Sequence, residues 1–258
     1  MIDLKIEIPG RKDFNCQFPE NHEEMTRRHL MVLTEFLATA KTDALAYTIM
    51  IKNYIGLPRK VVNAIQGEDL FYCEVVDGEV VMMPELTYLQ SPYANHHSLL
   101  PRWGTWRGPL DRAKNISIER IGYADMFAHD YAEAHTPKML NLFWAAMYRP
   151  ALMPWHKSLI DTYAQLARLV PRRVKEAALL NYRGLMTNCQ YSYPHVFGSG
   201  EKDGSEKYAW EGTIQKLAKT QTFGPYRDAR KTPLPNAMIH FEMNGLEVKK
   251  MNEKMKQK

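Results

Sequence analysis

The sequence predicts a mainly α-helical protein of the α+β class: a multi-helix domain with an N-terminal strand and one inserted β-hairpin. Three observations lead to this prediction. Apolar residues recur at helical spacing through most of the chain, a period-two alternation stands at the N-terminus, and a tight-turn signal joins two β-rich runs. The 258 residues are 45% hydrophobic and 24% charged, close to the globular average, so the chain can bury a core.

The first third of the chain supplies both β predictions. Apolar residues alternate with charged ones, as in a half-buried strand, at Ile2, Leu4, Ile6 and Ile8. A helix is expected to begin at Pro19–Asn21, and another over about Asp43–Tyr54. Residues 71–83 read FYCEVVDGEVVMM, and the Asp77-Gly78 dipeptide tolerates the positive φ angles of a type I′ turn. A β-hairpin is therefore predicted among the helices.

The next segment, residues 91–116, is predicted to be an extended, ordered connector because it lacks periodicity. Trp103 and Trp106 lie within it and are expected to anchor it. Core packing is the favoured role of this pair, and partner binding is the alternative, because Trp and Arg are enriched at binding hot spots. The connector separates an N-terminal helical subdomain with the hairpin, residues 1–90, from a C-terminal helical subdomain with a basic tail, residues 117–258.

The second half of the chain reads as successive helices. Ser117 is suited to cap the first, which would run to about His135. Further helices are expected over residues 137–149, 155–170, from 171 through 185, around 210–217 and from 234 to about 251. The polar, glycine-rich residues 198–206 predict a flexible loop.

Composition narrows the class of protein. The net charge is +5, and five lysines lie between Lys249 and Lys258, so the tail would suit nucleic acid or an acidic partner, or be a solvated terminus. Cys16, Cys73 and Cys189 are far apart and lack C-x-x-C spacing, which favours reduced thiols over disulfides or a zinc knuckle. Neither a signal peptide nor a membrane span is apparent, so an intracellular, soluble protein is expected.

One helical stripe has metal-ligand chemistry. Asp125, His129 and Glu133 are spaced by four residues, which places them on one helical face. Metal sites on helices normally take ligands from a second helix as well, and no matching Glu/His pair is evident. Paired side chains on a solvated face are the favoured interpretation, and a metal-dependent helical enzyme is kept as an alternative.

The densest basic and aromatic stretch lies between Arg102 and Arg120. Basic side chains neutralise phosphates and aromatic rings stack on unpaired bases, so this stretch supports nucleic-acid binding as an alternative function. An acidic protein surface would select the same residues, which are Arg102, Trp103, Trp106, Arg107, Arg112, Lys114 and Arg120. No P-loop and no G-x-S-x-G nucleophile turn is present, so we expect no enzyme activity, no cofactor and no metal.

Several short motifs occur in a recognisable order. They are Phe18-Pro19 before E-x-[LM]-T at residues 23–26, Leu57-Pro58, G-P-x-D-x-x-x-N-x-[ST] at 108–117, Y-R-P at 148–150, and Y-P-x-V-F at 193–197. In this order, the chain resembles a family of mostly uncharacterised proteins encoded among the tail genes of Bacteroidota phages and prophages. The hairpin and the basic C-terminus depart from the family pattern, and the family offers no catalytic residues to carry over.

The resemblance implies a non-enzymatic tail protein, either a structural tail or neck component or a tail-assembly (tape-measure) chaperone. Such a protein would act by binding other tail or virion proteins, in the host cytoplasm during assembly or in the virion tail. It would need no membrane contact, and self-association is compatible with it. Trp103, Trp106, Arg107 and Arg112 are the expected partner-binding residues, and the 15 methionines offer adaptable apolar side chains.

Overall fold

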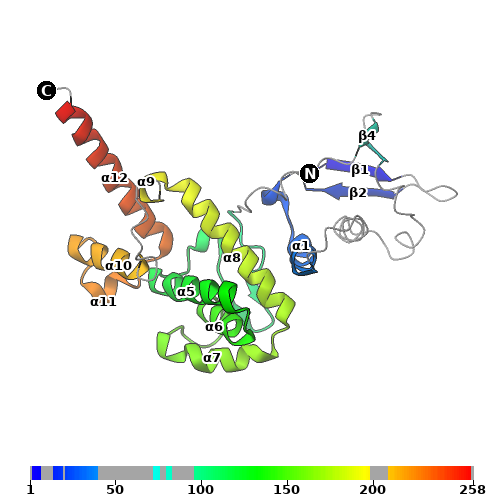
Figure 1. Cartoon of the computed structure of the whole chain (residues 1–258), viewed down its shortest axis with the longest axis horizontal. Coiled ribbons are helices and arrows are strands. Elements are labelled where there is room, and N and C mark those ends of the chain that lie inside the picture. Colours follow the sequence, from blue (N-terminus) through cyan, green and yellow to red (C-terminus); the bar gives the residue numbers. More distant parts are fainter. Residues whose placement is uncertain are drawn as a thin grey trace. The chain divides into compact units, whose positions relative to one another are not determined.

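The chain forms two compact units, Met1–Ala94 and Asn95–Lys258 (Figure 1). The computed structural model describes residues 2–6, 14–19, 21–39, 72–75, 80–82, 96–197 and 209–256. The fold is mainly α with a β-hairpin, as predicted. The predicted helix at Asp43–Tyr54, the turn at Asp77-Gly78 and the loop at 198–206 lie outside the described residues.

The first unit contains a four-stranded antiparallel sheet in the order β2-β1-β3-β4. Strand β1 (Ile2–Ile6) matches the predicted N-terminal strand, and β3 (Tyr72–Val75) pairs with β4 (Val80–Met82) as the predicted hairpin. Strand β2 (Phe14–Phe18) was not predicted. The hairpin is thus part of a larger sheet, because β3 also pairs with β1.

The helix predicted after Pro19 begins later than expected. A short 3-10 helix, η1 (His22–Glu24), comes first, and the side chain of Asn21 accepts hydrogen bonds from the backbone N–H groups of Glu23 and Glu24 at 3.0 and 3.2 Å. Helix α1 then spans Arg27–Thr39. The polar cap residue, and not the proline, therefore sets the helical start.

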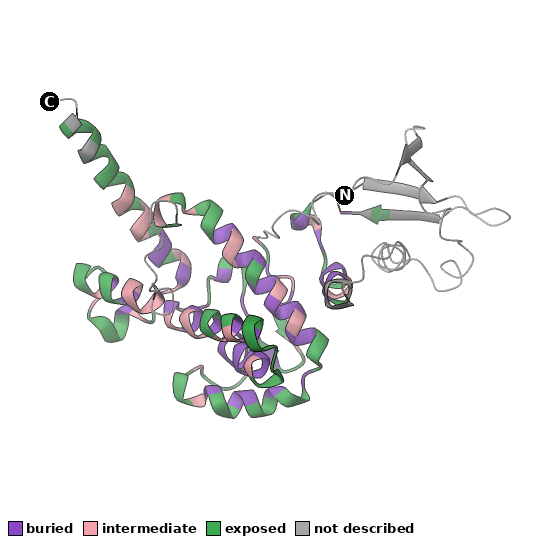
Figure 2. Ribbon diagram, viewed as in Figure 1, coloured by how far each residue is buried: buried purple, intermediate pink, exposed green. Residues whose placement is uncertain are grey.

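The core of the second unit is built around helix α6 (Pro137–Met147). Every residue from Leu140 to Met147 is buried, which places α6 at the centre of its neighbours (Figure 2). Helices α5 (Ile118–Ala134), α7 (Ile160–Leu166) and α8 (Arg172–Ser192) pack against it (Figure 1). Pro137 stands in the first turn, where its missing N–H costs no helical hydrogen bond.

Aromatic rings fill the space at the end of α6. Trp144 stacks on Tyr148 with ring centroids 3.9 Å apart and planes 6° apart. The Tyr148 hydroxyl donates a hydrogen bond of 2.7 Å to the backbone oxygen of Leu100. Trp106 lies edge-on to Trp144 at 5.9 Å and to Tyr163 at 6.4 Å. Trp106 is therefore a core residue, in agreement with the favoured interpretation of the connector.

The connector contains more regular structure than its sequence suggested. Strands β5 (Arg102–Trp103) and β6 (Trp106–Arg107) form a small hairpin, and β6 also pairs with β7 (Arg149–Pro150) after α6. Gly104 lies between β5 and β6 at a φ of 54°, which glycine adopts without strain. This three-stranded sheet ties the connector to the core of the second unit.

The remaining helices follow the predictions with three differences. The single helix expected over residues 155–170 is instead a series of shorter pieces: η4 (Lys157–Leu159), α7 and η5 (Ala167–Leu169). The short helices α9 (Pro194–Phe197) and α11 (Tyr226–Ala229) were not predicted. Helices α10 (Ala209–Thr220) and α12 (Leu234–Lys256) match predictions, with α12 longer than expected.

We expect Gly108→Ala to lower the free energy of unfolding of the second unit by about 1–3 kcal/mol, the usual cost of overpacking. A Cβ at Gly108 would lie 2.2 Å from Cε1 of Tyr148, whose ring cannot retreat because Trp144 stacks on it. Urea unfolding followed by tryptophan fluorescence measures the change.

Gly212→Ala is the matched control, because a Cβ there meets no atom within 4 Å and the residue lies inside α10. It should raise stability by up to about 1 kcal/mol through helix propensity. Equal unfolding midpoints for the two variants would contradict the close contact of Gly108 with Tyr148.

Candidate functional site

The four residues predicted to bind a partner differ in exposure. Arg107 and Arg112 are exposed and Trp103 is half-buried, whereas Trp106 is only 8% exposed. Arg112 and the following Ala113 both have positive φ angles, 54° and 52°. A partner contact from this stretch would therefore be made by Trp103, Arg107 and Arg112, with Trp106 holding the strand beneath them.

The basic stretch between Arg102 and Arg120 does not form one surface. Arg102 and Lys114 are exposed, whereas Arg120 is 6% exposed in the first turn of α5. Its Nε and Nη2 donate hydrogen bonds of 3.1 and 3.0 Å to the backbone oxygens of Ala146 and Met147 at the end of α6. No local sequence pattern indicates that this arginine is internal.

The three residues of the predicted metal stripe, Asp125, His129 and Glu133, make contacts with different partners. Asp125 accepts hydrogen bonds from the Tyr182 hydroxyl at 3.0 Å and from Nε1 of Trp210 at 3.2 Å, so it joins α5 to α8 and α10. Burial, and then the nearby Asp125 carboxylate, raises the pKa of Tyr182 well above its ordinary value. Asp125 thus has a structural role in this fold.

His129 and Glu133 lie on the exposed side of α5 with a 3.7 Å contact between Nδ1 and Oε1. The ligand atoms that approach within 4.8 Å of one another belong to His129, Asp130 and Glu133, so Asp130 stands where the sequence suggested Asp125. All three come from one helix. Exposed carboxylates at such spacing are common without a metal, and this cluster carries no functional conclusion.

Cys189 is a free, buried thiol on α8. Burial raises its pKa to about 12, which keeps it protonated and unreactive near neutral pH. This agrees with the expectation of a reduced structural thiol. The side chains of Cys16 and Cys73 lie outside what the structure describes.

The end of α12 carries a row of exposed apolar side chains. From Leu246 onward every described side chain is exposed (Figure 2). Val248, Met251 and Met255 are 57%, 63% and 68% exposed and are spaced by three and four residues, so they share one side of the helix. We refer to these three residues as the terminal surface.

A second row of exposed apolar side chains precedes the terminal surface on the same helix. Ile239, Met243 and Leu246 are also spaced by four and three residues, and the helical rotation of 100° per residue puts them on the opposite side of α12. A helix with apolar residues on two sides is normally enclosed by neighbours. Along this row α12 packs against α9, with Nδ1 of His195 2.6 Å from Oε1 of Glu242, whereas every described side chain from Leu246 onward is exposed.

Asp125→Ala should lower the free energy of unfolding by about 1–3 kcal/mol, because the buried Tyr182 hydroxyl would lose its acceptor. The loss should be the same with and without added Zn²⁺, as measured by thermal unfolding. Glu133→Ala, at an exposed position on the same helix, should change stability by less than about 0.5 kcal/mol. A stabilisation by Zn²⁺ that Asp125→Ala abolishes would restore the metal hypothesis.

Comparison with known proteins gives no assignment. The chain matches no protein-family model, no curated protein and no solved structure. Among the described helices, none is both long enough and apolar enough to cross a membrane.

Proposed function

We propose that the chain is a non-enzymatic protein of a bacteriophage tail that acts by binding other tail or virion proteins. It is either a structural tail or neck component or a tail-assembly (tape-measure) chaperone, working in the host cytoplasm during assembly or in the virion tail. The single observation that carries the binding role is the terminal surface of α12, which has no packing partner among the described residues.

An isolated helical segment is costly to maintain in water. The eleven residues from Leu246 to Lys256 span about 16 Å, and a helical segment of this length is marginal in water without tertiary packing. Exposed apolar residues in a row add a further cost, which a protein partner removes by covering them. Methionine suits this role because its flexible, polarizable side chain adapts to irregular surfaces.

The charges beside the terminal surface indicate the partner's chemistry. Residues 246–258 contain five lysines and two glutamates. Two copies of this segment would repel each other, whereas an amphipathic helix with acidic flanks would complement it. The partner we propose therefore presents an apolar stripe bordered by acidic side chains.

The assignment to a phage tail is supported by the ordered motifs, from Phe18-Pro19 to the Y-P-x-V-F segment at 193–197. Several of these motifs mark structural positions in the second unit. Gly108 lies against Tyr148, Ser117 caps α5, and Tyr148 precedes β7. In this chain these motifs therefore hold parts of the scaffold in place, which is compatible with a binding protein.

We expect the protein to be present at a fixed copy number, a multiple of six if it forms a ring with cyclic symmetry, in purified particles of the phage that encodes it. Quantitative mass spectrometry measures this number. Abundance in infected lysate together with absence from particles would identify the assembly factor instead. A gene outside any phage or prophage region would contradict the tail assignment.

The double variant Met251→Glu/Met255→Glu should reduce recovery of the bound tail protein by about tenfold or more, because a charge in an apolar interface loses its hydration. Glutamate is a good helix former, so α12 itself should persist. The measurement is co-purification of the tagged chain from infected cells, with the tail proteins quantified by mass spectrometry.

Leu152→Glu is the control, since Leu152 is 98% exposed and lies away from α12 in the sequence. It should leave recovery unchanged. Equal recovery with the double variant and with the control would exclude the terminal surface as the binding site, while leaving the particle measurement as the separate test of the tail assignment.

A further inference from the structure

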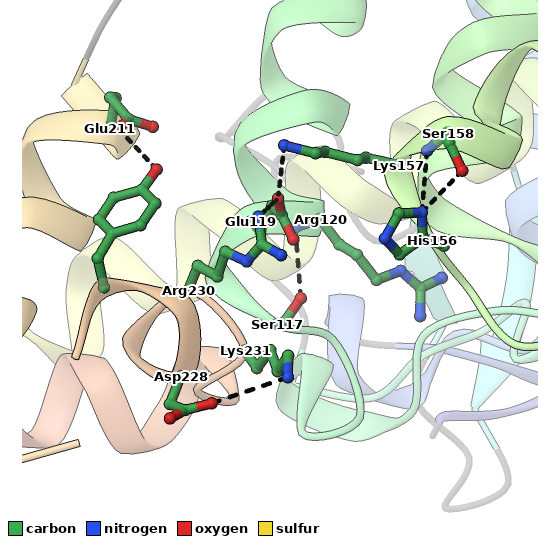
Figure 3. Close-up of polar contacts among 11 residues, drawn as sticks. Ser117, Glu119, Arg120, His156, Lys157, Ser158, Glu211, Asp228, Arg230 and Lys231 are labelled. Atoms are coloured by element: carbon green, nitrogen blue, oxygen red, sulfur yellow. Dashed lines mark hydrogen bonds and ion pairs between the residues drawn. The ribbon is translucent and has the colours of Figure 1, made fainter. Parts of the chain in front are cut away.

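A cleft of about 290 Å³ lies beside the start of α5, and its walls are rich in cationic side chains. Lys114, Arg120, Arg230 and Lys231 line it together with one carboxylate, Glu119. Figure 3 shows Glu119, Arg120, Arg230 and Lys231. Its volume is near the lower end of the range for small-molecule pockets, which begins at about 300 Å³. The four cationic residues come from segments more than 100 residues apart, so the fold and not the sequence brings them together.

A backbone clamp holds these segments in place. The N–H groups of Ile118 and Glu119 donate to the backbone oxygens of Thr232 and Arg230 at 3.0 and 3.2 Å, and Leu234 N–H donates to Ile116 at 2.9 Å. The Arg120 N–H donates to the hydroxyl of Ser117 at 3.4 Å. The first backbone N–H groups of α5 therefore already donate to acceptors within the protein. A ligand in the cleft must be recognised by side chains.

Arg120 is a buried cation without a carboxylate partner in the described part of the chain. Its two hydrogen bonds go to neutral backbone oxygens, and its guanidinium carbon lies 5.2 Å from the ring centroid of Trp155. Burial, and then the charge of Arg149, lower the pKa of Arg120 to about 9. Buried charges are normally paired, so this one favours an anion nearby.

Neighbouring side chains leave the cleft with excess positive charge. Glu119 is shared between Arg230 at 3.2 Å and Lys157 at 4.0 Å, and it is the one acidic residue in the lining (Figure 3). Lys231 contacts Asp228 at 3.8 Å, but both side chains are more than half exposed, where such a pair is weak. One carboxylate therefore faces four cations within the cleft.

Two buried N–H donors in the walls of the cleft also favour an anion. Nε of Arg230 and Nε1 of Trp155 are buried and have no hydrogen-bond partner among the described residues. A buried N–H without an acceptor is unfavourable by about 1–3 kcal/mol, and native structures rarely leave one so. The cleft thus combines donors and positive charge, the two requirements for binding an anion with several oxygens.

We propose that this cleft binds a phosphate group, with Arg230 as the guanidinium donor, Lys114 and Lys231 as the outer cations and Arg120 as a buried positive charge in the wall. Arginine presents several N–H donors that match phosphate geometry, and lysine adds point charges at the rim. A phosphate carries more charge and more acceptor oxygens than a carboxylate, so it fits four cations better. The phosphate belongs to a small molecule such as a nucleotide or to a nucleic-acid strand, and the test separates these sources.

The test uses the full-length chain and the double variant Lys114→Gln/Lys231→Gln. Both positions are exposed, so the substitutions should leave the fold intact, as checked by circular dichroism. Isothermal titration calorimetry with inorganic phosphate and with adenosine monophosphate should show saturable binding to the unmodified chain and binding weakened by about tenfold or more in the variant. Lys216→Gln/Lys219→Gln, with the same charge change on the exposed side of α10, should bind as the unmodified chain does.

The second arm measures binding of a labelled single-stranded oligonucleotide by fluorescence anisotropy over a range of salt concentrations. A nucleic-acid source predicts tighter binding than to the monophosphate, and a salt slope that falls by about 1.4 in the cleft variant, since two cations are removed. A small-molecule source predicts no gain from the longer ligand. The proposal is overturned if inorganic phosphate, adenosine monophosphate and the oligonucleotide all fail to bind saturably. It is also overturned if the cleft and control variants weaken binding equally.

Discussion

The burial of α6 is the constraint on which the second unit depends. Eight consecutive residues, Leu140–Met147, are removed from water, so the helix needs neighbours on every side. Helices α5, α7 and α8 supply three of these neighbours, and the connector supplies another by placing Trp106 against Trp144. Because Trp144 stacks on Tyr148, a side chain at position 108 would collide with the Tyr148 ring, which explains the glycine there.

The same helix determines where the basic cleft lies. The last carbonyl groups of a helix lack partners within it, and those of Ala146 and Met147 accept from Arg120. This contact draws a cation inward and joins the start of α5 to the end of α6. The backbone clamp between residues 116–119 and 230–234 then brings Arg230 and Lys231 beside it. The positive charge of the cleft thus follows from the hydrogen bonds made by the backbone groups at the end of α6 and the start of α5.

The two proposed surfaces of the second unit follow opposite physical rules. The cleft holds charge that lacks a counter-charge, whereas the end of α12 holds apolar area that lacks cover. Each is unfavourable in the isolated chain, and each would be relieved by a ligand of matching chemistry. A protein partner on α12 and a phosphate in the cleft therefore make independent contributions, and one protein can have both.

Local patterns in the sequence were enough to predict several elements. Alternation at Ile2–Ile6, the cap at Ser117 and the apolar spacing of α6, α8 and α12 all appear in the structure because strand, cap and helix signals act over a few residues. Strand β2 was not predicted, although the alternation of Phe14, Cys16 and Phe18 with polar residues is a local strand signal of the same kind.

Contacts between distant side chains depend on tertiary packing and could not be predicted. The two-residue strands β5, β6 and β7 are too short to leave a period, and they form because the connector returns to the end of α6. Trp106 is buried, as the favoured interpretation expected, whereas Arg120, which belonged to the predicted basic stretch, is buried too. Asp125 bonds to Tyr182 and Trp210 and is not part of the cluster around His129. Arg230 and Arg120 line the same cleft although more than 100 residues lie between them in the sequence. Long-range packing fixes such pairings, and no pattern within a single segment encodes them.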